Sequence, residues 1–288
     1  MNGAIYPPPL DKLLALGKPP MEDWQDYLAE GFGPSHVPEL IRMATDRSLL
    51  LPDTKELSLE MWGPVHAARV LGQLRAETAV EPLVRLLHDN EKFKDDWVSE
   101  EIPEVLGMIG QPAIPLLAAR LADDKEPLWP RVGMVQAIKE IADRHPEARA
   151  ECVGILAERL RHHRDQDVTL NTFLVVPLLE LKAVEVLPTI EDAFSSGSVD
   201  EWVVNWESVR EDLNLDPDYY PPGVVPWDAR LIDEGEGADE EEESPLAPLG
   251  AMYDDPVPGY GGHTQAEKKK ARTKKKQAAQ SRRKNRKK

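Results

Sequence analysis

The residues that most resemble a chemical site form a short polar run late in the chain. His162 and His163 are followed by Asp165 and Asp167, and imidazoles with carboxylates are the side chains that bind Zn²⁺. Adjacent histidines point in different directions on a helix, however, and no His-Glu-x-x-His motif accompanies them. The sequence therefore favours a polar loop between two helices, and we expect no metal and no other cofactor.

The single cysteine, Cys152, is the other candidate for chemistry. Val153, Leu156 and Leu160 follow it at helical spacing, which predicts a buried thiol. A nucleophilic cysteine needs a base and an orienting acid, and the sequence indicates neither. His66 and His88 are isolated and are expected to be packing or surface residues. Since phosphate-binding loops, nucleophile elbows and kinase motifs are also absent, we predict no catalytic residue.

The net charge of −17 conceals two oppositely charged parts. Thr264 to Lys288 carries 13 Lys or Arg and one acid, whereas residues 1–263 carry 22 basic and 51 acidic residues. The two balances are therefore +12 and −29. An acidic body repels nucleic acid and anionic lipid, while a basic tail attracts both.

The basic tail predicts salt-sensitive, sequence-independent binding to RNA or another polyanion, through neutralised phosphates. Without aromatic residues it cannot stack on bases. The predicted partners thus include RNA and the ribosome, while a role in solubility, contact with anionic lipid and folding back onto the acidic body remain open alternatives. The predicted polyanion-binding residues are Lys268, Lys269, Lys270, Lys274, Lys275, Lys276, Arg282, Arg283, Lys284 and Arg286.

The elements that position these residues are predicted to be short helices. Between residues 20 and 213, apolar residues recur at three- and four-residue spacing, and Pro, Gly, Asp and Asn interrupt the pattern every 15 to 20 residues. No run approaches the roughly 18 apolar residues of a membrane span. The first residues contain no cationic start with an apolar run, so no secretory signal is expected. One cysteine excludes an internal disulfide and fits a cytoplasmic location.

Internal sequence repeats indicate that these helices form an array of similar units. Leu71-Gly72-Gln73-Leu74 is echoed 35 residues later by Leu106-Gly107-Met108-Ile109, and each segment is predicted to close one helix just before the next. Tryptophans stand near the beginning of successive units at Trp24, Trp62, Trp97, Trp129 and Trp202. We predict helix pairs at 21–50, 58–92, 95–125, 127–163 and 165–197, and a closing helix at 199–213.

The paired helices, the 35-residue spacing and the prolines of the second helices, Pro82 and Pro115, resemble HEAT repeats. The resemblance is greatest to the bacterial class also called phycobilisome-lyase HEAT-like, and it covers about two thirds of the chain. It implies an all-α solenoid of about five helix pairs with a disordered C-terminal tail. Some bacterial relatives carry a Cys-rich zinc module at the C-terminus, which a chain with only Cys152 lacks. Such repeats serve as scaffolds in unrelated processes.

The predicted organisation has four parts. An N-terminal extension, residues 1–20, precedes the HEAT-like domain at 21–213. Consecutive prolines then end the helical pattern, and residues 214–263 form an acidic, Pro/Gly-rich linker that cannot bury enough apolar surface to fold. Residues 264–288 form the disordered basic tail.

Second-helix residues are the candidate protein-binding site. The resemblance places second helices on the concave side of the stack, where charged residues could meet a partner. Arginines followed by an apolar residue recur there, 43, 35 and 39 residues apart. The alternative is that each arginine pairs with an acid, either in the neighbouring repeat or four residues later, at Asp46, Asp89 or Asp124. The candidates are Arg42, Arg85, Arg120, Arg159, Glu81, Glu151, Glu158 and Glu191.

These features predict a non-catalytic scaffold or adaptor that binds an as yet unidentified protein and contacts RNA through its tail. Two alternatives remain open. One is an enzyme or enzyme subunit, such as a phycobilin-lyase-like chaperone, which requires an apolar pocket with converging polar groups. The other is a purely structural protein.

Overall fold

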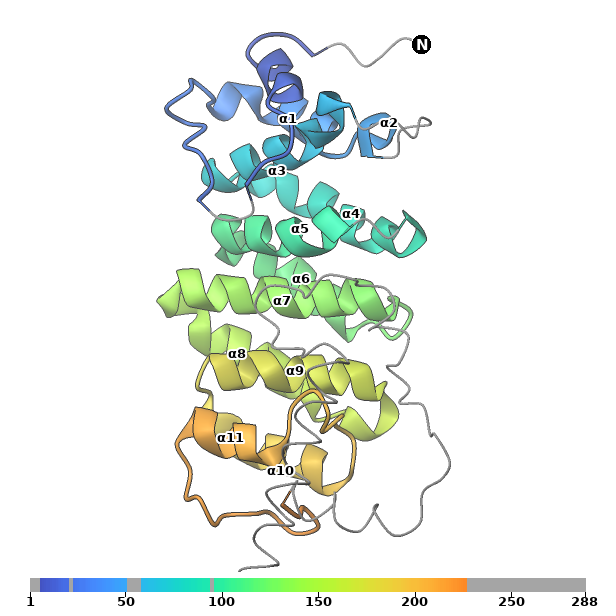
Figure 1. The fold of residues 1–288 in the computed structure, drawn as a ribbon, viewed down its shortest axis with the longest axis vertical. Helices are drawn as coiled ribbons and strands as arrows, with labels where there is room; N and C mark the ends of the chain where they lie inside the picture. Colours follow the sequence, from blue (N-terminus) through green and yellow to red (C-terminus); the bar gives the residue numbers. More distant parts are fainter. Residues whose placement is uncertain (1–5, 21–22, 51–57, 94–95, 227–288) are drawn as a thin grey trace, which may run out of the picture. The chain divides into compact units, whose positions relative to one another are not determined.

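The computed structural model describes residues 6–20, 23–50, 58–93 and 96–226. All the regular structure in these ranges is helical and none of it forms a strand, as an all-α solenoid requires (Figure 1). The predicted acidic linker from residue 227 on and the whole basic tail lie outside the described residues.

The α-helices come in consecutive pairs, and a short 3-10 helix joins the two members of each pair after the first. The α-helices are α1 (Val37–Ala44), α2 (Arg47–Leu50), α3 (Gly63–Gln73), α4 (Val80–Phe93), α5 (Asp96–Ile109), α6 (Ile114–Ala122), α7 (Leu128–Arg144), α8 (Arg149–Leu160), α9 (Val168–Glu180), α10 (Leu187–Ser195) and α11 (Trp206–Leu213). The 3-10 helices are η1 (Leu10–Ala15), η2 (Pro34–His36), η3 (Leu59–Trp62), η4 (Glu77–Ala79), η5 (Gln111–Ala113), η6 (Pro146–Ala148), η7 (His163–Asp165) and η8 (Val184–Val186).

The pairs α3–α4, α5–α6, α7–α8 and α9–α10 fall within the units predicted from the repeats, to within one residue. The first unit is more irregular than predicted, because residues 23–33 form turns and irregular backbone and only η2 and the short α1 and α2 are helical. Gly31, at φ +95°, and Gly33 lie in this segment. Glycine favours turns over helix, which accounts for the missing turns of helix.

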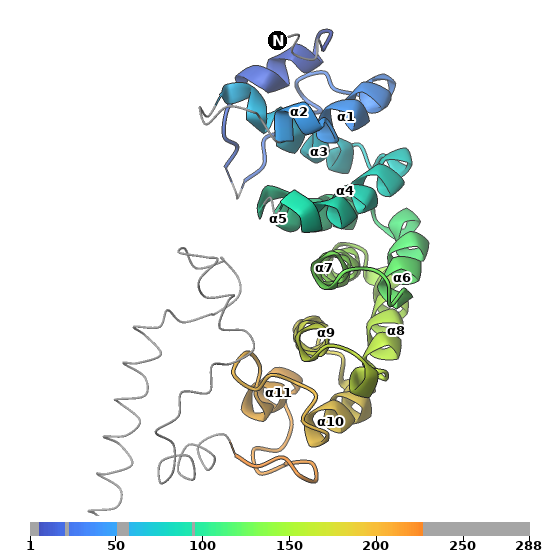
Figure 2. The same ribbon diagram turned by 90° about the vertical axis from the view of Figure 1, so that its right-hand side faces the viewer.

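Two layers of helices build the stack, as Figure 2 shows. We call α3, α5, α7, α9 and α11 the first-helix layer, and α4, α6, α8 and α10 the second-helix layer. Each of α3, α5 and α7 packs on the next member of its layer more extensively than second helices pack on one another. The stack therefore curves with the first-helix layer on its inner side. The prediction that second helices line the concave side is wrong for this chain.

The repeated Leu-Gly segments explain the close packing of the first-helix layer. A Cβ atom on Gly72 of α3 would lie 3.2 Å from the Met108 sulfur of α5, and one on Gly107 of α5 would lie 2.4 Å from Cβ of Glu140 on α7. At Gly107 only glycine permits so close an approach, because the Glu140 Cβ and backbone cannot move aside, whereas at Gly72 the flexible Met108 side chain could shift slightly. The repeated Leu-Gly motif thus contributes to the close packing on the inner side.

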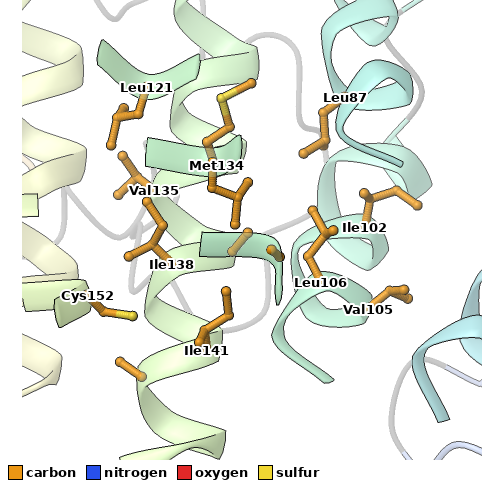
Figure 3. Close-up of a cluster of buried hydrophobic side chains, with 14 of the residues drawn as sticks. Leu87, Ile102, Val105, Leu106, Leu121, Met134, Val135, Ile138, Ile141 and Cys152 are labelled. Atoms are coloured by element: carbon orange, nitrogen blue, oxygen red, sulfur yellow. The ribbon is translucent and has the colours of Figure 1, made fainter. Parts of the chain in front are cut away.

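The core is continuous along the stack, and α7 lies at its centre (Figure 3). Because α7 contacts α5, α6, α8 and α9, its apolar residues are buried on more than one side. Met134 and Ile138 are fully buried on α7, and Cys152 of α8 points toward this helix. Burial raises the pKa of the Cys152 thiol to about 11, which confirms the buried thiol predicted from the sequence.

Both ends of the compact part extend beyond the repeats. At the N-terminal end, Leu10 and Leu13 of η1 are buried. At the other end, Nε1 of Trp206 donates to the Tyr219 carbonyl over 2.8 Å, and Val224 is buried. The compact unit therefore ends at Pro226, and the predicted boundary at residue 213 is too early.

Within the described ranges, no single helix is long and apolar enough to span a membrane. One pair of consecutive helical segments is long and apolar enough when its members are taken together, namely Asp96–Ile109 and Gln111–Ala122. The chain bends by 114° between them.

Candidate functional site

The solvent-facing residues of the first-helix layer form one stripe along each of α5, α7 and α9. On α7, a buried face packs into the stack, whereas residues at spacings of three and four are at least partly exposed. The same spacing recurs on α5 and α9. The stripes comprise Trp97, Glu100, Glu104 and Met108 on α5, Trp129, Val132, Gln136, Glu140 and Asp143 on α7, and Phe173, Val176 and Glu180 on α9.

Aromatic side chains occupy the N-terminal half of each stripe. Trp97 and Trp129 each stand second in their helices, and Trp62 immediately precedes α3. The rings contact one another across repeats, with 4.9 Å between the centroids of Trp62 and Trp97 and 6.2 Å between those of Trp129 and Phe173. Trp129 remains 41% exposed. We call Trp62, Trp97, Trp129 and Phe173 the aromatic row.

Carboxylates occupy the C-terminal half of each stripe. Glu104, Glu140, Asp143 and Glu180 form what we call the acidic row. The C-terminal end of a helix carries partial negative charge, so the helices reinforce the potential of this row. Two cations, Lys139 and Arg144, lie among the four acids and leave the row net negative.

Ion pairs tie the acidic row together across repeats. Arg144 of α7 lies 2.7 Å from Glu104 of α5, and Lys139 of α7 lies 3.4 Å from Glu180 of α9. Burial alone would lower the pKa of Lys139, but a hydrogen bond to Asp143 and the charges of Glu140 and Glu180 raise it. The acidic row therefore already binds one ammonium group, from Lys139, and one guanidinium group, from Arg144, which are the kinds of cation that a basic partner carries.

Two acids of the α5 stripe are only partly compensated. Burial raises the pKa of Glu104, and the nearby Glu140 and Glu101 add to the rise, although Arg144 opposes it. Burial and the neighbouring Asp96 and Glu101 likewise raise the pKa of Glu100. Because a raised pKa means that the carboxylate charge is disfavoured, an additional cation would stabilise both groups.

The arginines predicted from the sequence lie on α1 and on the second-helix layer. Arg42 pairs with Glu39 over 2.6 Å and stacks on Tyr6, Arg85 is exposed, and Arg120 lies 3.3 Å from Glu126. Arg159 of α8 reaches Asp124 of the preceding unit at 2.6 Å. Pairing with the neighbouring repeat is thus confirmed for Arg159.

The sequence also offered pairing of an arginine with the acid four residues later, at Asp46, Asp89 or Asp124. In the structure these acids have other partners. Asp89 binds Arg47 of the preceding unit over 2.5 Å, and Asp46 accepts a hydrogen bond from Tyr6. Asp46 and Asp124 lie just beyond the ends of α1 and α6, where a side chain can turn away from its own helix.

The predicted acidic candidates do not converge. Glu81 and Glu151 are exposed on α4 and α8. Glu158 pairs with Arg161, and Glu191 accepts a 2.5 Å hydrogen bond from the Tyr219 hydroxyl. All four lie on the second-helix layer, and the predicted tail residues lie outside the described part of the chain.

The polar run after α8 is a link between helices. His163 is buried, with Nε2 2.9 Å from Asp192 and Nδ1 3.1 Å from Ser198, while Asp167 caps α9 by accepting from the Thr169 amide. In the part of the chain that the structure describes, no group of three or more His, Cys, Asp or Glu is placed to hold a metal ion.

Sequence reasoning missed the acidic row because it assigned the inner side to the second helices. The signal was present in the helix periodicity, since an aromatic residue and later carboxylates recur at compatible spacings on 96–109, 128–144 and 168–180.

Comparison with known proteins identifies the repeats. Residues 64–129, which span α3 to the start of α7, match the family model of HEAT repeats. This match supports a HEAT-repeat protein and does not extend to the phycobilisome-lyase class. No curated protein and no solved structure matches the chain.

Proposed function

We propose that the protein is a non-catalytic cytoplasmic adaptor whose first-helix layer binds a basic, amphipathic segment of a partner protein. The observation that carries this proposal is the common polarity of the three stripes, each of which begins with an aromatic residue and carries at least one carboxylate in its C-terminal half. HEAT repeats, which match residues 64–129, are scaffolds of this general kind.

Each row contributes differently to binding. Large aromatic side chains supply most of the apolar contact area at protein interfaces and are frequent energetic hot spots. The acidic row would attract basic residues and fix the orientation of the segment, since electrostatic complementarity governs association rate and specificity. A helix with leucines on one side and lysines on the adjacent side has the matching pattern.

The alternative of a chromophore-binding enzyme subunit has less support. A cavity near α3 and α5 encloses about 30 Å³. Its lining includes Met61, Trp62, Val65, Trp97 and Glu101. Small-molecule sites typically enclose roughly 300–1,000 Å³. An extended surface therefore fits the stripes better than a pocket does.

The test uses a fluorescein-labelled amphipathic peptide of leucine and lysine and the full chain. The double variant Glu104→Gln/Glu180→Gln should weaken binding about threefold to tenfold, as expected when two partly exposed charge contacts are lost. The control variant Glu81→Gln/Glu151→Gln removes the same charge from the second-helix layer. Equal losses in the two variants would show that net charge alone attracts the peptide and would refute the proposal.

The natural partner can be sought with the same variants. A pull-down with wild-type protein, followed by mass spectrometry, should recover a protein that Glu104→Gln/Glu180→Gln loses and Glu81→Gln/Glu151→Gln retains. A purely structural protein would show no such difference.

The composition of residues 264–288 supports a second proposal, that this tail binds RNA or another polyanion. Its 13 basic residues could displace many counterions from a phosphate backbone. Deleting Thr264 to Lys288 should remove co-purifying RNA and the salt dependence of its binding. A tail with the same residues in scrambled order should restore both, and failure of the scrambled tail would contradict sequence-independent binding.

A further inference from the structure

Two tryptophans at the beginning of successive repeats, Trp62 just before α3 and Trp97 on α5, lie beside the same cation. The rings of Trp62 and Trp97 meet edge to face, with an interplanar angle of 84° and 4.9 Å between centroids. The Lys18 ammonium nitrogen lies 5.7 Å from the centroid of Trp62 and 5.6 Å from that of Trp97. Both distances are within the roughly 6 Å over which a cation is attracted to an aromatic face.

The two rings are held in place by the fold. Trp62 ends η3 and directly precedes α3, whereas Trp97 lies in the first turn of α5, and both side chains are partly buried. Since α3 and α5 pack closely at Gly72, the distance between the rings is set by the stack. The pair is therefore a preformed site.

Lys18, in contrast, is held weakly. It is an exposed residue between Gly17, at φ +72°, and Pro19. Its ammonium group stands near the outer limit of the favourable distance from both rings. A competing ammonium group can displace it by closer approach to either ring.

Carboxylates beside Trp62 and Trp97 also favour a positively charged group at this place. Glu100 lies one turn after Trp97 on α5, and Asp96 immediately precedes that tryptophan. Partial burial, Asp96 and Glu101 raise the pKa of Glu100, and Lys18 opposes this rise, which shows that the carboxylate lies within electrostatic reach of the ammonium group. Glu101 itself is committed to Arg69 through a 2.5 Å contact.

We infer that Trp62 and Trp97, with Glu100, form a binding site for the ammonium group of a partner lysine, and that Lys18 occupies this site in the unbound protein. The inference rests on the proposed function, because the lysine belongs to the basic segment bound by the first-helix layer. Lys18 is thus a competitive internal ligand that lowers the affinity for the partner.

The first test uses tetramethylammonium as the probe and follows the indole N–H resonances of the full chain by NMR. The probe should shift the resonances of Trp62 and Trp97 and leave that of the exposed Trp202 unchanged. Lys18→Ala should strengthen this binding about twofold to fivefold, the range expected when one exposed cation–aromatic contact no longer competes. Equal shifts at all tryptophans would overturn the inference.

The second test uses the labelled leucine–lysine peptide. Lys18→Ala should raise peptide affinity about twofold to fivefold, whereas Lys12→Ala, which removes the same charge from the exposed surface of η1, should raise it less. A peptide in which lysines are replaced by norleucine should lose the difference between the two variants. If Lys18→Ala and Lys12→Ala behave alike, the site does not exist.

The two proposals fail in different ways. Loss of the difference between Lys18→Ala and Lys12→Ala, with the effect of Glu104→Gln/Glu180→Gln retained, refutes the ammonium site and leaves the adaptor function standing. If tetramethylammonium binds at Trp62 and Trp97 but Glu104→Gln/Glu180→Gln binds the peptide as tightly as wild type does, the proposed function is refuted and the ammonium site stands. Trp62→Leu should abolish probe binding, and the lysine variants remain informative if that variant does not fold.

Discussion

Gly107 on α5 lies directly against Glu140 on α7, so that a Cβ atom at residue 107 would stand 2.4 Å from the Glu140 Cβ. It would also stand 3.1 Å from the backbone carbonyl carbon of Glu140, which cannot move without shifting α7. The close approach of these two helices therefore depends on the missing side chain.

We expect Gly107→Ala to lower the free energy of unfolding by about 1–3 kcal/mol, the usual cost of forcing an extra group into a packed contact. Urea denaturation followed by circular dichroism measures this change. Gly154→Ala is the matched control, because Gly154 lies in α8 and a Cβ atom added there would meet no neighbouring group within 4 Å. Alanine should stabilise that helix by about 0.4–1 kcal/mol. Destabilisation of similar size in both variants would contradict the steric explanation.

The buried pair of Arg69 and Glu101 joins α3 to α5 and gives the second prediction. The two side chains are 0% and 7% exposed, and two atoms of the guanidinium group contact the two carboxylate oxygens. Glu101→Gln leaves the Arg69 charge without its counterion and should cost about 3–5 kcal/mol of unfolding free energy. Replacing both residues with Met and Leu should cost less than the single change, because no charge then remains buried.

The exposed pair of Lys182 and Asp212 is the control for that prediction. The two side chains are 61% and 43% exposed, so water solvates both groups when the pair is broken. Asp212→Asn should leave the urea midpoint nearly unchanged. A loss as large as that of Glu101→Gln would mean that inter-repeat pairing in general, and not burial, determines the effect.

His66 gives a prediction for the dependence of stability on pH. Its imidazole is buried, with Nδ1 2.5 Å from the Tyr27 hydroxyl and Nε2 2.8 Å from the Gly17 carbonyl oxygen. Burial lowers the pKa of His66, and the nearby Arg69 lowers it further, although the hydrogen bond to Gly17 opposes the change. The folded protein therefore binds a proton here less readily than the unfolded chain does.

The contribution of neutral His66 is fully present above the ordinary histidine pKa of about 6.5 and is lost as the pH falls toward the lowered pKa. We expect wild-type protein to lose more stability than His66→Gln between pH 7.5 and pH 5.5 in urea titrations. Glu100 and Glu104, whose pKa values are raised, act in the opposite direction, but they are common to both proteins. His162→Gln, at an exposed site, should behave as the wild type does.

The helix pairs were predictable because short-range periodicity and the echo of Leu71-Gly72 at Leu106-Gly107 depend only on local sequence. The direction of curvature was not predictable from the same residues. It depends on how closely α5 approaches α7 at Gly107, which is a contact between distant residues. The predicted site was therefore assigned to the outer layer.

The packed ends were missed for a related reason. Residues 214–226 are rich in Pro and Asp and show no helical periodicity, so they read as a linker. Their order comes from specific long-range contacts, such as Trp206 with the Tyr219 carbonyl, that composition does not reveal. His66 likewise appeared isolated in the sequence, although Tyr27 and Gly17 reach it across 39 and 49 residues.

The raised pKa values of Glu100 and Glu104 predict how binding by the first-helix layer depends on pH. Burial is the main cause for both groups, and neighbouring acids add to the rise. As the pH falls, both carboxylates gain a proton at a higher pH than an ordinary glutamate, whose pKa is about 4.3. Affinity for a basic peptide should therefore fall before ordinary surface glutamates titrate.

Peptide titrations between pH 7.5 and pH 4.5 measure this effect, with the lysines of the peptide charged throughout. Glu104→Gln should bind more weakly than wild type at pH 7.5 and show a shallower decline as the pH falls, because one of the titrating groups is gone. The control Glu81→Gln, on the second-helix layer, should follow the wild-type curve. The same slope for wild type and Glu104→Gln would mean that the peptide does not sense this carboxylate, and the first-helix layer would then not be the binding surface.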